Sequence, residues 1–268
     1  MGVMLPRRQL GKTGIEISAI GLGTVKLGRN VGVKYPTPFE IPSDEDVRHL
    51  LDGAQELGIN LIDTAPAYGN SEGRIGALLR GHRNNWVICT KAGEEFDGET
   101  RKSSFDFSPE AIERSVMRSL QRLETDRLDV VLLHSDGRDA WILRESGALE
   151  ALIGLKDKGV VQAVGISAKT VDGALLGVER TDVVMITLNE RERESASVIE
   201  KAAEVGCGVL VKKVFASGHG AQDAGGVERA LEFALSQVGV ASVVVGTVNP
   251  GHLAQNVEVA ERVIVEGV

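Results

Sequence analysis

The sequence is poor in cysteine and has no long apolar run. Its two cysteines, Cys89 and Cys207, lie far apart, and neither has a second cysteine at metal-ligand spacing. This excludes a disulfide framework and a cysteine-based zinc site. No apolar run approaches the roughly 18 residues of a membrane span, and residues 1–10 lack the apolar core of a signal peptide. We therefore expect a cytoplasmic protein without a membrane anchor.

Positive charge is also scarce. Lys and Arg number 30 against 38 Asp and Glu, which gives a formal net charge of -8. Bulk electrostatics therefore do not draw the chain to nucleic acid or to an anionic membrane, and local geometry has to hold any anionic ligand. The histidines are scattered without carboxylate or cysteine partners, so no metal site is expected. The expected partner is a small molecule, and the protein is expected to be a monomer or a weak homo-oligomer.

The composition is that of a soluble globular protein. Apolar residues make up 43% of the chain and charged residues 25%. No linker divides the chain, so a single domain over residues 1–268 is expected. Eight short apolar runs without polar alternation predict strands that are buried on both faces of a parallel sheet. These runs are residues 19–25, 59–63, 86–91, 128–134, 160–167, 182–188, 208–215 and 242–248.

Helical patterns alternate with these runs. Ser43 is placed to cap a helix that ends at Gly58, and Ser108 followed by Pro109 begins a second helix. Eight strands alternating with eight helices predict a (β/α)8 TIM barrel, with a doubly wound sheet as the competing architecture. Residues 7–18 are predicted to form a short β-hairpin at the bottom of the barrel. Weaker helical stretches are predicted at residues 71–81, 146–158, 170–179, 195–205, 226–237 and 250–266.

Three short motifs are weighed and rejected. Residues 11–14 lack the upstream glycine of a phosphate-binding P-loop. Gly21 and Gly23 lack the third glycine of a dinucleotide-binding loop. His134 is followed directly by Ser135 and Asp136, whereas the members of a hydrolase triad have to converge in space.

Four ionisable residues stand at or just after the ends of apolar runs. Asp63 ends the second run and Tyr68 follows it, while Lys91 ends the third run and His134 the fourth. The C-terminal ends of barrel strands surround the active site, so these side chains are predicted to gather there. Any one of them alone has an ordinary structural explanation. The four together on three neighbouring strands indicate catalysis.

These residues also carry a resemblance to a known family. Together with LGKTGIEISAIGLGT near the N-terminus, ISA after the fifth strand and VVVGTVNPGHLAQN near the C-terminus, they make the chain resemble the aldo-keto reductases over nearly its whole length. The resemblance implies a barrel that binds an extended nicotinamide cofactor and moves a hydride between it and a carbonyl compound or an alcohol. It also implies that Asp63, Tyr68, Lys91 and His134 are the catalytic residues.

The chemistry of these residue types suits such a reaction. Hydride transfer to a carbonyl carbon leaves negative charge on the oxygen, which needs a proton from a positioned acid. Tyr68 suits this task if its pKa, ordinarily about 10, is lowered toward neutrality. We expect the Lys91 ammonium to lower it and Asp63 to keep that ammonium charged. His134 is expected to orient the substrate oxygen.

The resemblance also assigns cofactor contacts, and here the chain departs from the family. Ser167 remains of the three residues that usually hold the carboxamide, but Ala168 and Met185 replace the two amide side chains. Lys212 stands where an aromatic residue usually stacks on the nicotinamide ring, with Phe215 and Met185 as apolar substitutes. The other residues that the resemblance assigns to cofactor binding are Gly23, Thr24, Asp63, Ser217, Gly246, Thr247, Asn249, His252, Gln255 and Asn256.

The end of the eighth strand is predicted to hold a cofactor phosphate. Pro250 begins a helix there, and the free amides and dipole of a helix start favour an anion. Gly246 and His252 replace the Lys and Arg that usually pair with a 2′-phosphate in the family. We still expect NADP(H) to be preferred slightly over NAD(H), because His252 or a loop arginine can compensate.

The expected function is therefore NAD(P)(H)-dependent oxidoreduction of a small aldehyde, ketone or sugar. Residues 105–115 and 135–139 also resemble family members that oxidise sugars, so an NAD-dependent aldose dehydrogenase is one alternative. A non-catalytic subunit that senses nicotinamide through the same barrel is another. The last expected helix ends with the chain, so we also expect an open pocket with weak substrate discrimination.

Overall fold

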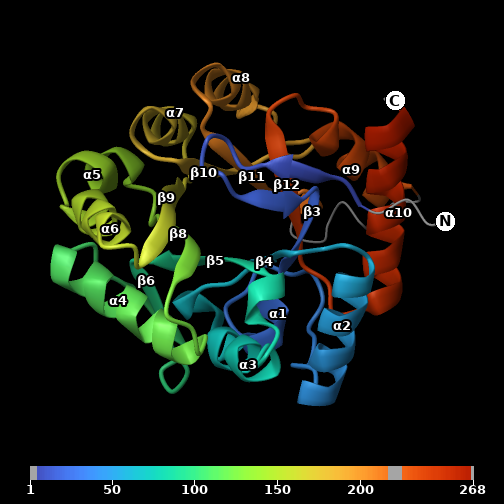
Figure 1. The fold of residues 1–268 in the computed structure, drawn as a ribbon, viewed down its shortest axis with the longest axis horizontal. Coiled ribbons are helices and arrows are strands. Elements are labelled where there is room, and N and C mark those ends of the chain that lie inside the picture. Colours follow the sequence, from blue (N-terminus) through green and yellow to red (C-terminus); the bar gives the residue numbers. More distant parts are fainter. Residues whose placement is uncertain (1–4, 217–224, 267–268) are drawn as a thin grey trace.

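Eight parallel strands form a closed barrel in the computed structural model, which describes residues 5–216 and 225–266. Each barrel strand pairs with the next one along the chain, and β12 pairs with β3 to close the ring (Figure 1). The strands are β3 (Ile20–Gly23), β4 (Leu61–Asp63), β5 (Val87–Ala92), β8 (Leu128–His134), β9 (Val161–Ser167), β10 (Val183–Thr187), β11 (Gly208–Lys212) and β12 (Val240–Val245). All eight predicted strands are confirmed.

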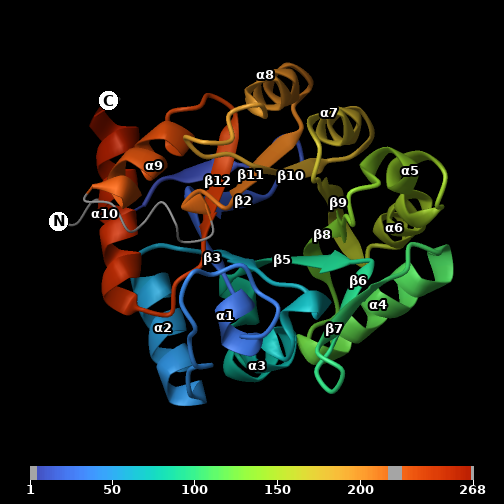
Figure 2. The same ribbon diagram turned by 180° about the vertical axis from the view of Figure 1, so that it is seen from behind.

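Helices cover the outside of the barrel, as the two opposite views show (Figures 1 and 2). The Ser43 side chain accepts a hydrogen bond from the Asp46 amide at the start of α2. Ser108 caps α4, with Pro109 in its first turn. The outer helices are α2 (Asp44–Glu56), α3 (Ser71–Leu78), α4 (Pro109–Arg122), α6 (Ala148–Asp157), α7 (Val171–Arg180), α8 (Ala196–Val205), α9 (Gly226–Leu235) and α10 (Pro250–Glu266). The predicted (β/α)8 barrel is therefore confirmed.

An N-terminal hairpin closes one end of the barrel. β1 (Arg7–Gln9) pairs antiparallel with β2 (Glu16–Ser18). Leu10 and Ile17 are fully buried among the apolar side chains inside the barrel. A side chain at Gly208, the first residue of β11, would collide with Leu10, which places the hairpin at the N-terminal ends of the strands. The predicted hairpin is confirmed, and the opposite end of the barrel is left for a site.

Short elements at that opposite end are not predicted by the sequence patterns. A second antiparallel hairpin, of β6 (Glu94–Asp97) and β7 (Lys102–Phe105), follows β5. These pieces are too short to show a helix or strand period, which is why pattern reasoning misses them. The other short elements at this end are α1 (Val25–Gly28) after β3, η1 (Pro66–Tyr68) after β4 and α5 (Asp139–Arg144) after β8, whereas η2 (Arg83–Asn85) precedes β5 and lies at the N-terminal end of the strands.

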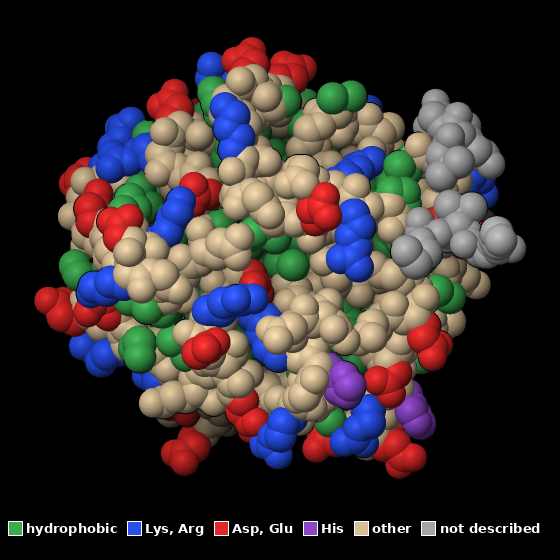
Figure 3. Space-filling model, viewed as in Figure 1, with side chains coloured by type: hydrophobic (Ala, Val, Ile, Leu, Met, Phe, Trp, Pro, Cys, Tyr) green, Lys and Arg blue, Asp and Glu red, His purple; other side chains and the backbone are tan. Residues whose placement is uncertain are grey.

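The surface carries charges of both signs. On the face shown in Figure 3, Lys and Arg side chains alternate with Asp and Glu side chains and do not gather into a patch of one sign. In the described part of the chain, none of the helices combines the length and the hydropathy that a bilayer crossing requires.

Candidate active site

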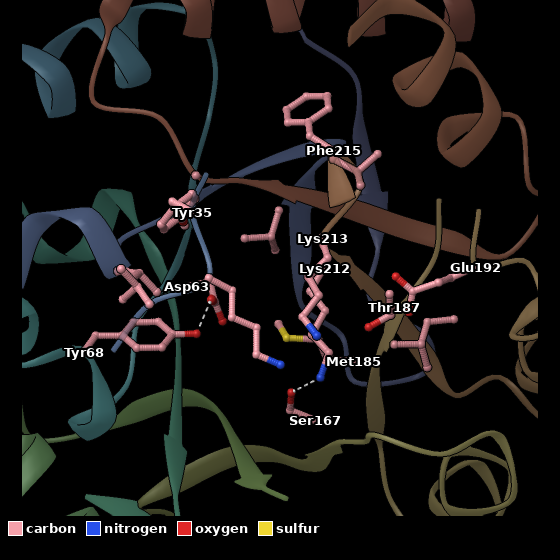
Figure 4. Close-up of a pocket in the computed structure, with 18 of the residues that line it drawn as sticks. Tyr35, Asp63, Tyr68, Ser167, Met185, Thr187, Glu192, Lys212, Lys213 and Phe215 are labelled. Atoms are coloured by element: carbon pink, nitrogen blue, oxygen red, sulfur yellow. Dashed lines mark hydrogen bonds between the residues drawn. The ribbon is translucent and has the colours of Figure 1, made fainter. Parts of the chain in front are cut away.

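A cavity of about 910 Å³ opens at the C-terminal end of the barrel. This volume lies within the usual range of small-molecule pockets, roughly 300–1,000 Å³. Strand ends and the connections that follow them line the cavity. In Figure 4, Tyr68 and Asp63 lie on one side of it, and Ser167, Met185 and Lys212 lie on the other.

Asp63 and Lys91 form a buried ion pair behind one wall of the cavity. Lys91 Nζ donates hydrogen bonds to Asp63 Oδ1 at 2.5 Å and to the Thr64 carbonyl at 2.9 Å, and Lys91 is 1% exposed. Burial by itself lowers the pKa of Lys91, but the charge of Asp63 and the neighbouring Tyr68 phenol outweigh burial and raise this pKa. The ammonium is therefore retained at neutral pH.

Tyr68, at the end of η1, turns its phenol toward the same carboxylate. Its Oη donates a long hydrogen bond of 3.5 Å to Asp63 Oδ2 (Figure 4). Lys91 Nζ lies 4.7 Å from the centroid of the Tyr68 ring. Burial and the charge of Asp63 raise the pKa of Tyr68, and the opposing effect of Lys91 does not balance them. Lys91 does lower the pKa of this phenol, as expected, but burial first and the charge of Asp63 after it have the larger effect, so the phenol does not become acidic in the free pocket.

His134, the last residue of β8, packs edge-on against Tyr68, with the ring centroids 6.2 Å apart. Its Nδ1 lies 3.1 Å from Glu94 Oε2, but the angle is not that of a hydrogen bond, and no described residue provides one for this nitrogen. Burial, and after it the positive charge of Lys91, lowers the pKa of His134. The imidazole is therefore neutral, with one ring N–H that can be donated to a ligand.

Lys212 and Ser167 end their strands on the facing wall. Lys212 Nζ donates hydrogen bonds to Ser167 Oγ at 2.7 Å and to the Ala168 carbonyl at 2.9 Å (Figure 4). Burial, and after it the like charges of Lys213 and Lys91, lower the pKa of Lys212 to about 7. This wall therefore carries a lysine that is protonated only in part at neutral pH.

Buried hydrogen bonds hold the two walls in place. The Thr24 amide and hydroxyl both donate to the Asp63 carbonyl, at 3.0 and 2.8 Å. Asp139 accepts hydrogen bonds from the amides of Lys169 and Thr170, which fixes the loop after β9. Thr24 is predicted as a cofactor contact, but it is fully buried and does not line the cavity. In the structure Thr24 instead positions Asp63 through these two hydrogen bonds.

The far end of the cavity lies beside the start of α10. Asn249 Oδ1 accepts hydrogen bonds from the amides of Gly251 at 2.8 Å and His252 at 3.2 Å. The amides predicted to be free for a phosphate are therefore already bound, because Asn249 caps the helix. The predicted cofactor residues that do line this end are Gly246, Thr247, His252, Gln255 and Asn256.

The cavity brings most of the other predicted site residues together. Asp63, Tyr68 and His134 line it, whereas Lys91 lies behind them. Asn249 does not line the cavity, and Ser217 lies outside the described residues. The remaining predicted residues that line the cavity are Gly23, Ser167, Met185, Lys212 and Phe215.

Several lining residues are not singled out by the sequence patterns. Tyr35 reaches the cavity from the loop between α1 and α2, and Lys26 Nζ lies 4.4 Å from its ring centroid. Burial and the charge of Asp63 raise the pKa of Tyr35. This loop has no periodic pattern, so the sequence could not identify Tyr35 as a residue of the cavity wall. Thr187 ends β10 and Lys213 directly follows β11. The position of a polar residue at the end of an apolar run, which pointed to Lys91 and His134, could also have identified these two. Further missed lining residues are Lys34, Glu94, Lys169 and Glu192.

The residues present fit a dinucleotide. A Cβ at Gly23 would lie 3.0 Å from a Val244 methyl group, and one at Gly246 would lie 3.0 Å from Tyr35 Oη, so glycine keeps these two places of the wall free of side chains. Lys34 and Lys213 line the cavity and can pair with phosphates. Among residues 5–216 and 225–266, no three or more His, Cys, Asp or Glu side chains are grouped so that they could hold a metal ion.

The chain is similar to known proteins in sequence and in fold. A family model described as the aldo/keto reductase family matches residues 19–222. D-threo-aldose 1-dehydrogenase from a Pseudomonas species is 30% identical, with 95% of this chain and 92% of that protein covered.

Two solved structures are similar over nearly the full length. A Pseudomonas aeruginosa protein described provisionally as an aldo-keto reductase has a TM-score of 0.87 and 48% identity, covering 96% of this chain and 95% of that one. The holo form of an aldo-keto reductase from Bacillus halodurans has a TM-score of 0.79 and 26% identity, covering 96% of this chain and 91% of that one.

Proposed function

Because the chain belongs to the aldo/keto reductase family, we propose that it moves a hydride between a nicotinamide cofactor and a small carbonyl compound, with Tyr68 as general acid or base. Membership of this family makes the chain an oxidoreductase. The proposed substrate is a small aldehyde, a ketone or a sugar in its carbonyl or lactol form.

The observation that carries the proposal is the sharing of Asp63 between Lys91 and Tyr68 at the cavity wall. Reduction of a carbonyl group puts negative charge on its oxygen, and a positioned acid has to supply a proton. The raised pKa of Tyr68 keeps its phenol protonated in the free pocket. The proton passes from Tyr68 Oη to the substrate oxygen, and in the oxidative direction it returns to Tyr68.

Lys91 and His134 support this transfer in different ways. After Tyr68 gives up its proton, the phenolate lies beside the Lys91 ammonium, which stabilises the negative charge. Asp63 keeps that ammonium charged in a buried place. His134 is neutral and donates a hydrogen bond that orients the substrate oxygen.

The cofactor is proposed to lie along the rest of the cavity. When bound, the nicotinamide supplies or accepts the hydride. Ser167, Met185 and Lys212 form the wall that would hold the nicotinamide ring, since they face Tyr68 (Figure 4). Gln255 and Asn256 offer amide groups to the adenosine end.

Between the two nucleotides we propose a slight preference for NADP(H). His252 lines the adenosine end and can donate a hydrogen bond to a 2′-phosphate. The margin is small because Asn249 already occupies two amides at the start of α10. Tighter binding of NADPH than of NADH, measured by quenching of tryptophan fluorescence, is the expected result. Equal or tighter binding of NADH would reverse the assignment.

Oxidation of an aldose is the second candidate function. The observation that favours it is the 30% identity to D-threo-aldose 1-dehydrogenase over 95% of this chain. The same groups would then act in the oxidative direction, with Tyr68 accepting the proton of the sugar hydroxyl. Initial rates with aldoses and an oxidised cofactor, compared with rates for aldehydes and a reduced cofactor, distinguish the two candidates.

The Tyr68→Phe variant tests the proposal. With small aldehydes, ketones and aldoses, kcat/KM is expected to fall about 10²- to 10⁴-fold, the range found for a lost general acid. The affinity for the cofactor is expected to stay nearly unchanged. Tyr35→Phe, which removes the other cavity phenol, is the matched control and should lose far less activity.

Three outcomes would contradict parts of this proposal. Full activity of Tyr68→Phe would remove Tyr68 from the reaction. Cofactor binding by the wild type without turnover of any substrate class would favour a nicotinamide-sensing subunit. Binding of neither NADPH nor NADH would contradict the proposed function as a whole.

A further inference from the structure

Lys212 is an unusual residue at the wall that faces Tyr68. We propose that Lys212 distinguishes the oxidised from the reduced nicotinamide ring by charge, so that its protonated form weakens binding of the oxidised cofactor only. The proposal rests on the proposed function, because it requires the nicotinamide ring to lie on this wall.

The position of the ring follows from the reaction. The carbon that gives the hydride and the carbon that receives it have to approach within about 3–3.5 Å. The substrate oxygen has to lie within hydrogen-bond reach of Tyr68 Oη. The ring is therefore held between the substrate and the wall opposite Tyr68. Figure 4 shows that Lys212, Ser167 and Met185 form that wall.

Lys212 has neutral partners. Its Nζ donates to Ser167 Oγ and to the Ala168 carbonyl, and within the described ranges no carboxylate comes within ion-pair distance of it. A lysine held by neutral oxygens gains or loses its proton without breaking an ion pair. The charge on this wall can therefore change while its hydrogen-bond acceptors stay in place.

Burial, and after it the charges on the surrounding elements, set the proton occupancy of Lys212. Lys213 and Lys91 disfavour the proton, whereas Asp63 and Asp139 favour it. Together with burial, these charges bring the pKa of Lys212 to about 7. The titratable groups around it are Lys213 directly after β11, Lys91 on β5, Asp63 on β4, His134 on β8, Asp139 on α5 and Lys169 after β9.

The two cofactor states differ in the charge of the ring. The oxidised ring is a cation and the reduced ring is neutral, so a protonated Lys212 repels only the oxidised form. Even in bulk water, two like unit charges about 4 Å apart weaken binding about fivefold. The ratio of the oxidised to the reduced dissociation constant is therefore expected to be large below about pH 7, where Lys212 is protonated, and to fall above it.

Dissociation constants test this inference without turnover. The Kd values of oxidised and reduced NADP are measured by isothermal titration calorimetry from about pH 6 to about pH 8.5, a window that spans the pKa of Lys212. In the wild type the ratio of the two constants is expected to fall at least about threefold across this range, because the full fivefold effect is reached only where Lys212 is completely protonated. Lys212→Met should give a low ratio that does not change with pH. Lys212→Arg, which keeps its charge, should give a high ratio that does not change.

Lys213→Met is the matched control. It removes a neighbouring cavity lysine and should keep the change in ratio, with the midpoint moved to higher pH because one repelling charge is gone. If Lys212→Met binds neither form of the cofactor, the other two variants still test the role of Lys212. Lys212→Arg should give a ratio that does not change with pH, and Lys213→Met should give a midpoint at higher pH.

The contradicting results separate the two proposals. A wild-type ratio that does not vary with pH, or a Lys212→Met ratio that varies as in the wild type, would overturn the role of Lys212 and leave the proposed function standing. Failure of the wild type to bind either form of the cofactor would overturn both.

Discussion

For individual side chains, the feature that governs the site is the double use of one carboxylate. One oxygen of Asp63 accepts a hydrogen bond from Lys91 and the other accepts one from Tyr68. Burial and, after it, this negative charge raise the pKa of Tyr68, while for Lys91 the same charge outweighs burial and raises the pKa. In the free pocket the Tyr68 phenol is therefore protonated and the Lys91 amine is charged. After Tyr68 has given up its proton, this ammonium can stabilise the phenolate.

The Asp63→Asn substitution is expected to destabilise the fold. It leaves the Lys91 ammonium buried without its counter-ion, and breaking a buried pair in this way costs about 3–5 kcal/mol. Urea unfolding measures the loss. The added change Lys91→Met should restore part of the stability, because it removes the uncompensated charge. Glu124→Gln, in the exposed pair with Arg80, is the control and should change the free energy of unfolding far less.

Two results would contradict this prediction. One is an Asp63→Asn variant as stable as the Glu124→Gln control. The other is a double variant less stable than Asp63→Asn alone. Either would mean that the buried charge of Lys91 is solvated in a way that the 1% exposure of this residue does not indicate.

The sequence could locate these side chains but not their protonation. Asp63, Lys91 and His134 each end an apolar run, so a barrel has to bring them to one end. The direction of the Tyr68 pKa depends on which oxygen of Asp63 faces the phenol and on how deeply the phenol is buried. The spacing of residues in the sequence gives neither of these. The partial protonation of Lys212 likewise depends on burial and on charges that only the fold brings near it.

Among the connections, the loop after β9 depends on a buried acid from another element. Asp139, in the first turn of α5, accepts hydrogen bonds from the amides of Lys169 and Thr170 and from the Thr170 hydroxyl. It is 1% exposed. This contact joins α5 to the segment that directly follows Ser167, so it holds one wall of the cavity.

The Asp139→Asn substitution should therefore destabilise the protein by about 1–3 kcal/mol, because buried donors lose their charged acceptor. Asp136→Asn is the control. Asp136 lies in the same loop region, but its carboxylate accepts hydrogen bonds from the amide and guanidinium of Arg138 within its own turn. Its substitution should change the free energy of unfolding by less than about 0.5 kcal/mol. Denaturant unfolding of both variants checks the difference. Equal losses would show that Asp139 does not anchor the loop.

The regular elements were predictable, whereas the connections around the cavity were not. Buried parallel strands have to be apolar on both faces, and this marks them strongly in the sequence. The β6–β7 hairpin and α5 are too short to show a period, and the loop with Tyr35 has none, so tertiary contacts such as that of Lys26 with Tyr35 decide their course. The sequence also could not show that the Asn249 side chain turns back on its own helix and accepts hydrogen bonds from two amides at the start of α10.

Across the protein as a whole, the charge of the cavity differs from that of the chain. The chain has a formal net charge of -8, yet the cavity is lined by more cations than carboxylates. The lining cations are Lys26, Arg29, Lys34, Lys169, Lys212 and Lys213, and the lining carboxylates are Asp63, Glu94, Glu192 and Glu194. An anionic cofactor is thus attracted by the cavity against the charge of the rest of the molecule.

Added salt should weaken cofactor binding, because the lining cations lie partly in water where salt screens them. The Kd of NADPH is expected to rise several-fold between about 50 mM and about 500 mM sodium chloride, as the screening length shrinks. Fluorescence quenching measures the Kd, and the free energy of unfolding in the same salts is the control for the fold. A Kd that does not depend on salt would show that the cations of the cavity do not hold the phosphates.

The protonation of Tyr68 can be measured from tyrosinate absorbance. The chain has two tyrosines, Tyr35 and Tyr68, and burial together with the charge of Asp63 raises the pKa of both. Titration of the folded wild type and of Tyr68→Phe gives the ionisation of Tyr68 by difference. We predict no tyrosinate from Tyr68 below about pH 10, the ordinary tyrosine pKa. One equivalent formed near neutral pH in the wild type and absent from Tyr68→Phe would contradict a protonated phenol as the proton donor.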